Sequence, residues 1–240
     1  MYPDLPDLRR LERKTLKVLV ETSEFGLFKE MQDEARRARV DSDYGGVDVH
    51  LHFVADVRMR SDAAKTSMMR RIDIGALIES GAPKCGFSRA SYSLLIAKGE
   101  QPAKSPVLRK VHFDVEPQEC RNTGEPKPTV HMQVCGKLSR AHVTAGYTSQ
   151  RLAGLYPHFE KPRIPCSPTS LALLIDWVML EFQSDTRLLR ASRSARWRAL
   201  VSEAEQIVLK PYFTHCLQKL SVAAQQSSTS FSRRYLYEVA

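Results

Sequence analysis

Three segments of the chain alternate apolar and polar residues, and this alternation restricts the possible folds more than any other feature. They cover residues 47–58, 107–116 and 130–135. Successive side chains of a β-strand point to opposite faces, so each segment is expected to form a strand with one apolar and one polar face. Apolar strand faces must be buried against a second layer. We therefore expect a sheet with one covered face.

Helical patterns precede and follow these strands in the sequence. Residues 7–21 place apolar side chains at helical spacing, with Asp4 or Asp7 available as a cap, and a second helix is expected over residues 23–39. Residues 169–182 follow a Ser-Pro pair that is typical of a helix start, and they are apolar nearly all round. This last helix is expected to be buried.

Arginine recurs at every third position before the last apolar segment, at Arg187, Arg190, Arg193 and Arg196. One straight helix would bury Arg190 and Arg193, because the apolar stripe that begins at Trp197 extends backwards over both positions. We therefore expect a break near residues 191–194, with an arginine-rich corner between two helices. Pro211 is expected to disturb the second of them.

The expected fold is α+β, with an antiparallel sheet of four or five strands, helices packed on one face and a C-terminal helical region. Residues 88–98 supply a further strand, whereas residues 61–80 fit either a helix or an edge strand. The expected organisation is N-terminal helices and sheet over 1–160, helices packed on the sheet over 161–220, and a flexible tail over 221–240.

The charge balance points to a polyanionic partner. The chain has 36 Lys and Arg against 27 Asp and Glu, a formal net charge of +9. Nucleic acid is the expected partner, RNA favoured over DNA. No apolar stretch reaches the ~18 residues of a membrane span and no signal peptide is recognisable, so we expect a cytoplasmic protein without a membrane partner. The 5 cysteines are odd in number and form no CxxC pair, which argues against disulfides and a structural zinc site.

Four histidines lie on the polar faces of the expected strands: His50, His52, His112 and His131. In one hypothesis His112 and His131 lie side by side and cleave an RNA phosphodiester as base and acid, and the candidate catalytic residues are His112, His131, Asp114 and Lys110. In a second, the alternative ligands His50, His52 and His112, with Asp114 or His131, bind a divalent metal. In a third, these residues only form the polar face of the sheet.

One short stretch, GGVDVHLHFVAD at residues 45–56, resembles the first metal motif of the cupins, which implies metal binding inside a barrel. The resemblance covers a dozen residues, has Asp56 where the motif has Glu, and is followed by no second cupin motif, so the chain is not assigned to that family. P-loop, GxGxxG, GxSxG and HExxH motifs are absent.

Together these features predict a nucleic-acid-binding protein, and they leave open whether it is an enzyme. The most specific form of the prediction is a metal-independent ribonuclease without a cofactor. The alternative is a non-enzymatic basic subunit of a multiprotein nucleic-acid-processing complex, in which the helix at 171–182 and the C-terminal tail bind a protein partner. In both cases Arg187, Arg190, Arg193 and Arg196 are expected to contact phosphates.

Overall fold

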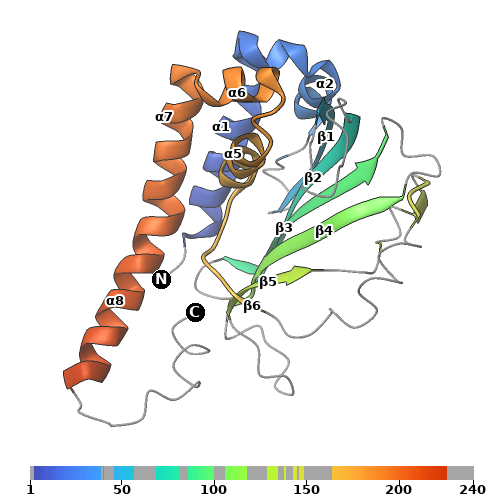
Figure 1. Ribbon diagram of the computed structural model, residues 1–240. Coiled ribbons are helices and arrows are strands. Elements are labelled where there is room, and N and C mark those ends of the chain that lie inside the picture. Colours follow the sequence, from blue (N-terminus) through green and yellow to red (C-terminus); the bar gives the residue numbers. More distant parts are fainter. Residues whose placement is uncertain are drawn as a thin grey trace.

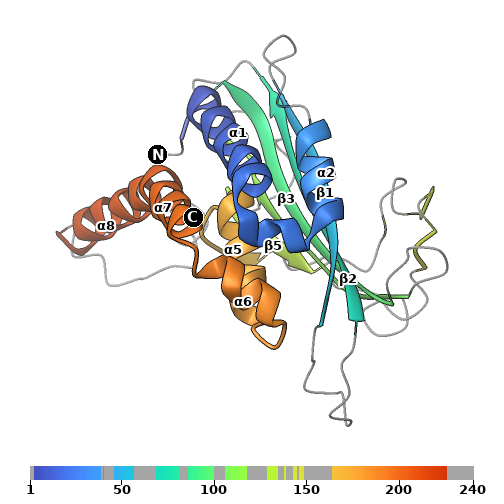
Figure 2. The same cartoon turned by 90° about the horizontal axis from the view of Figure 1, so that it is seen from above.

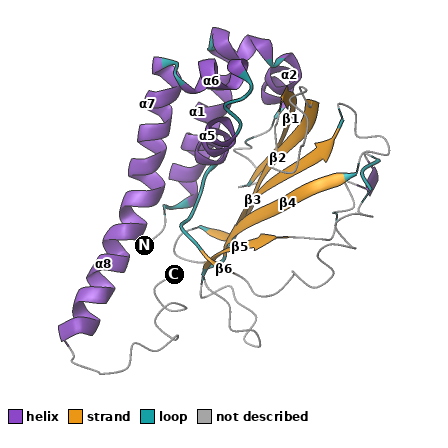
Figure 3. Ribbon diagram, in the orientation of Figure 1, coloured by secondary structure: helices purple, strands orange, loops and turns teal. Residues whose placement is uncertain are grey.

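The computed structural model describes residues 3–38, 40, 46–56, 69–81, 86–99, 106–117, 129–134, 138, 143–144, 146–148 and 164–225. The main helices and the strands form two separate layers (Figure 1, Figure 3). None of the described helices is long and apolar enough to cross a membrane. Residues 226–240, which belong to the predicted tail, and residues 118–128 lie outside the described residues.

The sheet is an antiparallel meander whose strands follow one another in sequence order. Its five long strands confirm the predicted antiparallel sheet, and a two-residue strand extends its last edge. The strands are β1 (Val47–Asp56), β2 (Met69–Ser80), β3 (Phe87–Lys98), β4 (Val107–Val115), β5 (Val130–Val134) and β6 (Ile164–Pro165). β1 and β6 lie at the two edges, so the sheet is open rather than a cupin barrel.

The ambiguous segment at 61–80 contributes β2, which pairs with a neighbour on each side and is not an edge strand. Ile72, Ile74, Ala76 and Ile78 are buried in the core. This spacing of two is the strand pattern, and it prevails over the weaker helical pattern because the apolar face is buried by the helices. Residues 61–68 lie outside the described part of the chain.

The helices are α1 (Leu5–Glu21), the 3₁₀ turn η1 (Ser23–Leu27), α2 (Lys29–Arg37), α5 (Leu171–Glu181), α6 (Thr186–Ser192), α7 (Ala195–Ala204), the π turn η3 (Glu205–Leu209) and α8 (Lys210–Gln225). α1, α2 and α5 cover one face of the sheet, and α7 packs on the outer side of α1 and α5 (Figure 2). Asp4 caps α1 by accepting the backbone N–H of Asp7 at 2.9 Å. The predicted packing of helices on one face is confirmed.

One continuous core joins the N-terminal and C-terminal helices to the sheet. Glu12 of α1 is fully buried within it and connects three elements. Its Oε1 accepts the Tyr92 hydroxyl of β3 at 2.9 Å and the backbone N–H of Leu171, at the start of α5, at 3.2 Å. The C-terminal helices therefore complete the core of the sheet.

The predicted break in the arginine segment is confirmed, because α6 ends at Ser192 and α7 begins at Ala195. Ser194 caps α7 by accepting the backbone N–H of Trp197 at 3.3 Å. Ser170 caps α5 in the same way, so the observed cap lies three residues after Ser167, the serine of the Ser-Pro pair that was expected to start this helix.

Pro211 lies at the second position of α8, directly after the π turn. Proline lacks an N–H and clashes with the carbonyl of the preceding turn, and a wider π turn accommodates both effects. The helix therefore continues through Pro211. It reaches Gln225, inside the range predicted as a tail, and extends past the end of α1 (Figure 1, Figure 2).

Candidate functional site

The side chains predicted to form a polar face do share one face of the sheet, opposite to the face that α1, α2 and α5 cover. Cross-strand pairing shows this, because residues paired across neighbouring strands point to the same side. One row runs across five strands through His50, Gly75, Ser93, His112 and Gln133. A second row runs through Asp48, Leu77, Ser91, Asp114 and His131.

The candidate metal ligands are not brought together. His50 and His52 lie on β1 and His112 lies on β4, three strands away. At ~4.8 Å between neighbouring strands this separation is about 14 Å, too far for one ion to bind all three imidazoles. Among the described residues no group of three His, Cys, Asp or Glu side chains could hold a metal ion.

His112 and His131 lie on neighbouring strands, but they are diagonal neighbours with different partners. His112 Nε2 lies 2.7 Å from Gln133 Oε1. His131 Nε2 lies 3.6 Å from Asp114 Oδ2, and Asp114 Oδ1 accepts the Arg89 guanidinium at 3.1 Å. Burial raises the pKa of Asp114, but a hydrogen bond from Ser91 and the charge of Arg89 outweigh it and lower that pKa. Asp114 is therefore held as an anion between Arg89 and His131.

The accessibility of these groups decides what they can do. His131 is only 1% exposed, and Asp114 and Lys110 are also buried, whereas His112 is half-buried. An acid and a base that act on one phosphodiester must both reach it within hydrogen-bonding distance. The burial of His131 favours a structural role for it, as the partner of Asp114. Cleavage by the His112 and His131 pair stays a prediction.

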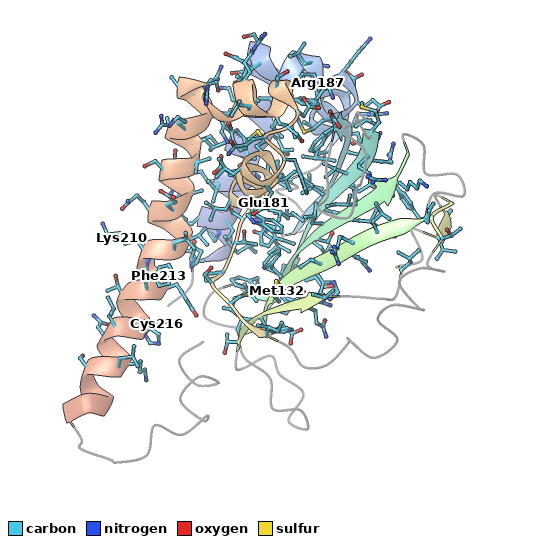
Figure 4. All side chains as sticks on the ribbon, in the orientation of Figure 1. Met132, Glu181, Arg187, Lys210, Phe213 and Cys216 are labelled. Carbon is cyan, nitrogen blue, oxygen red and sulfur yellow. The ribbon has the colours of Figure 1, made fainter. Side chains whose placement is uncertain are left out.

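Arg187 and Arg196 are engaged within the protein. Arg187 forms a salt bridge with Asp185 at 2.6 Å, donates to the Val54 carbonyl at 3.0 Å and stacks over the Phe28 ring at 5.0 Å. It thus joins α6 to β1 at one end of the molecule (Figure 4). Arg196 forms a salt bridge with Glu21.

Arg190 and Arg193 have a different environment, because they line open pockets at the turn between α6 and α7. The first pocket has a volume of about 430 Å³, and both arginines line it together with Ser194 and Glu24. A second pocket of about 530 Å³ is lined by Arg193 and Arg198 and by two acidic residues, Asp176 and Glu205. No salt bridge connects Arg190 or Arg193 to an acidic group of the described residues. We refer to Arg190 and Arg193 as the arginine corner.

A third, smaller pocket lies on the polar face over β1, β2 and β3, and we call it the polar pocket. Its volume is about 150 Å³, and its polar lining comes from Glu34, His50, His52, Arg71, Asp73, Ser93 and Tyr147, with Gly75 also lining it. The sequence singled out only His50 and His52 of this set. Arg71 and Asp73 lie on β2, whose strand pattern would have placed them on the polar face, but no local signal indicated Glu34 or Tyr147.

The polar side chains that line the pocket form two hydrogen-bonded groups. Glu34 Oε1 contacts His52 Nδ1, and Glu34 Oε2 accepts the backbone N–H of His52 at 2.5 Å. Arg71 Nε donates to Asp73 Oδ1 at 3.0 Å and to the Tyr147 hydroxyl at 2.6 Å, and that hydroxyl donates to Asp73 Oδ2 at 2.5 Å. Tyr147 also packs with Leu95, Ala97 and Val107 in a small second core on this face.

The electrostatics of the polar pocket reflect burial of charge. Burial raises the pKa of Asp73, although the Tyr147 hydroxyl and the Arg71 guanidinium oppose this effect. The pKa of Tyr147 is raised by burial and by its hydrogen bond to Asp73, so the phenol remains a proton donor at neutral pH. The pocket thus holds hydrogen-bond donors and acceptors side by side.

No protein-family model matches this chain, and comparison with curated proteins and with solved structures gives no match either. Function therefore has to be inferred from the geometry of the pockets and the surface charge.

Proposed function

We propose that the protein binds nucleic acid without cleaving it, and that the arginine corner makes the phosphate contacts. The observation behind this proposal is the position of Arg190 and Arg193, which line open pockets and form no salt bridge with the described acidic groups. Guanidinium groups in such a position are available to phosphate oxygens, which they bind in a bidentate manner. The net charge of +9 adds a long-range attraction for any polyanion.

The surroundings of the corner favour an anion over a cation. Ser194 caps α7 here, so the positive end of that helix lies beside both arginines. Glu24 is the acidic residue that lines the first pocket, and it offsets part of this charge. In the first pocket two guanidinium groups and a helix N-terminus face one carboxylate, which leaves that pocket positive. In the second pocket Asp176 and Glu205 offset Arg193 and Arg198.

Binding without cleavage is supported by the state of the strand histidines. His131 is buried and paired with the Asp114 carboxylate, so it is poorly placed to protonate a leaving group. The ribonuclease hypothesis has one observation in its favour, which is that His112, Asp114 and His131 share a face. Incubation of labelled RNA with the wild type and with H112A/H131A decides between them: cleavage lost in the variant, with binding kept, would establish the nuclease and refute this proposal.

The exposed apolar side chains of the C-terminal helices support the role of a subunit. Trp177 and Leu180 of α5 are exposed, as are Phe213, Leu217 and Leu220 of α8, of which Leu217 is 67% exposed. Phe213 lies on the part of α8 that extends away from the other helices (Figure 4). Exposed apolar side chains grouped on one helix are typical of a protein-binding surface. We expect the double variant F213D/L217D to lose a co-purifying protein while its affinity for nucleic acid stays unchanged; simultaneous loss of both would refute separate surfaces.

The arginine corner is tested by the salt dependence of binding. The affinity of the wild type and of R190Q/R193Q for a labelled single-stranded RNA is measured by fluorescence anisotropy across a salt series. Each lost phosphate contact should reduce the slope of log affinity against log salt by about 0.7, so the double variant should lose about 1.4. R196Q is the matched control, because Arg196 is already paired with Glu21. Equal slopes for the wild type and R190Q/R193Q would contradict the proposal.

A further inference from the structure

The polar pocket has no part in the phosphate contacts proposed above, and its size limits what it can bind. A cavity of about 150 Å³ accepts a single six-membered ring such as benzene. The polar pocket has this volume, with its opening on the polar face of the sheet. One aromatic ring fits, whereas a fused purine or a whole nucleotide exceeds it.

Gly75 lets the neighbouring side chains approach the central strand closely at one side of the pocket. A Cβ at this position would lie 2.7 Å from Ser93 Oγ and 3.5 Å from His50 Nδ1. Any side chain larger than hydrogen would therefore clash with Ser93. The missing side chain lets the Ser93 hydroxyl and the His50 imidazole pack against the backbone of β2, where both line the pocket.

The charges in the pocket exclude the simplest ligands. Glu34 and Asp73 would repel a phosphate, and Arg71 already balances only one of them. Among the described residues no three ligating groups converge on a point that could hold a metal ion. Donors and acceptors of similar number instead favour a group that is neutral, planar and polar, as a nucleobase is.

The free hydrogen-bonding capacity of the pocket indicates which base edge fits. Arg71 is only 12% exposed, and its described hydrogen bonds all use Nε, which leaves the two terminal nitrogens to donate towards a ligand. Asp73 lies directly beside them as an acceptor. Cytosine presents two acceptors, O2 and N3, next to a donor, the N4 amino group. Uracil has an oxygen where cytosine has this amino group, so a carboxylate there would repel it.

We propose that the polar pocket binds one unpaired pyrimidine base, cytosine in preference to uracil, with Arg71 donating to O2 and N3 and Asp73 accepting from N4. His50 packs over Gly75 at the side of the pocket with its side chain 75% exposed, so its imidazole can stack on the base. This inference rests on the proposed function, because the base would belong to the same single strand whose phosphates the arginine corner binds. It adds base preference to a contact that is otherwise independent of sequence.

The first test compares oligocytidine and oligouridine RNA by fluorescence anisotropy. The wild type should bind oligocytidine about 10-fold to 100-fold more tightly, as one bidentate contact to a base allows. Arg71→Lys keeps the charge and removes the planar fork, so it should abolish this preference while the salt slope stays unchanged. Arg89→Lys is the matched control, because Arg89 lies on the same face and pairs with Asp114 outside the pocket. Equal affinities of the wild type for both RNAs would overturn the proposal.

The second test does not depend on binding of a polymer or on a buried variant. Cytidine is titrated into the wild type and into His50→Ala, whose substituted side chain is exposed, and the Arg71 side-chain NH signal is followed by NMR. We expect a saturable shift with cytidine, a weaker one with uridine, and an affinity for cytidine reduced several-fold in His50→Ala. A shift with cytidine but no binding of RNA would support the pocket and refute the proposed function. RNA binding with no shift for either nucleoside would support the proposed function and refute the base-binding pocket.

Discussion

Glu12 offers a quantitative test of the way the C-terminal helices are joined to the sheet. Burial raises the pKa of its carboxyl from 4.5 to about 7, although the hydrogen bonds from Leu171 and Tyr92 oppose the effect. In the unfolded chain the group is exposed and has its ordinary pKa. The folded protein therefore binds a proton more tightly than the unfolded chain between these two pH values.

The size of the effect follows from the two pKa values. One pKa unit corresponds to ~1.4 kcal/mol, so the rise of the Glu12 pKa from 4.5 to about 7 corresponds to ~3 kcal/mol. Because the folded pKa is raised, the contribution of Glu12 to stability is complete below pH 4.5, decreases as the pH rises towards 7, and is lost above that value. Glu12→Gln cannot titrate, and its amide oxygen can accept the same two hydrogen bonds. The free energy of unfolding of Glu12→Gln should therefore lack this pH-dependent contribution.

The assay is urea unfolding of the wild type and Glu12→Gln at several pH values between about 4.5 and 8. The amide nitrogen would replace Oε2, which has no hydrogen-bond partner among the described residues, and its cost is the same at every pH. The difference in unfolding free energy between wild type and variant should thus shift by ~3 kcal/mol in favour of the variant from the lowest to the highest pH. Glu203→Gln on the surface serves as the control and should show no such shift. Parallel pH profiles for the wild type and Glu12→Gln would refute the reasoning.

Three further predictions test other contacts of the described residues. Asp185→Ala removes the buried acceptor of the Arg187 guanidinium, and thermal melts should show a loss of about 3 kcal/mol; an unchanged Tm would contradict the role of this pair. The lowered pKa of Asp114 contributes stability that is present above pH 3.8 and lost as the pH falls through its folded value, so Asp114→Asn should be less stable than the wild type at pH 7 and approach it in acid. His112→Ala should leave both the fold, followed by circular dichroism, and RNA binding intact, since its partner Gln133 is partly exposed; a loss of RNA binding would place His112 in the interface.

The layered fold could be predicted because its signals are local. Strands β1, β4 and β5 each alternate with a period of two, and each begins at the predicted residue. The break between α6 and α7 could also be predicted, since one straight helix would have buried Arg190 and Arg193. In both cases the pattern of apolar residues reports which side of an element is buried.

The polar pocket could not be predicted, because its residues come together only through the fold. Glu34 follows from how α2 lies along the edge of β1, and Tyr147 reaches Asp73 across a long separation in sequence. The burial of His131 could not be predicted either, because a histidine on the polar side of a strand is expected to be exposed. Its pairing with Asp114 depends on the register between β4 and β5, which the alternation alone does not fix.

The most direct measurement for the central claim is the affinity of the wild-type protein for a single-stranded oligonucleotide at two salt concentrations. Two phosphate contacts at the arginine corner predict that the affinity falls at least about sevenfold when the salt rises from about 50 to 200 mM. Additional contacts would steepen this loss. An affinity that does not change between the two salt concentrations, or no binding at the lower one, would contradict the account.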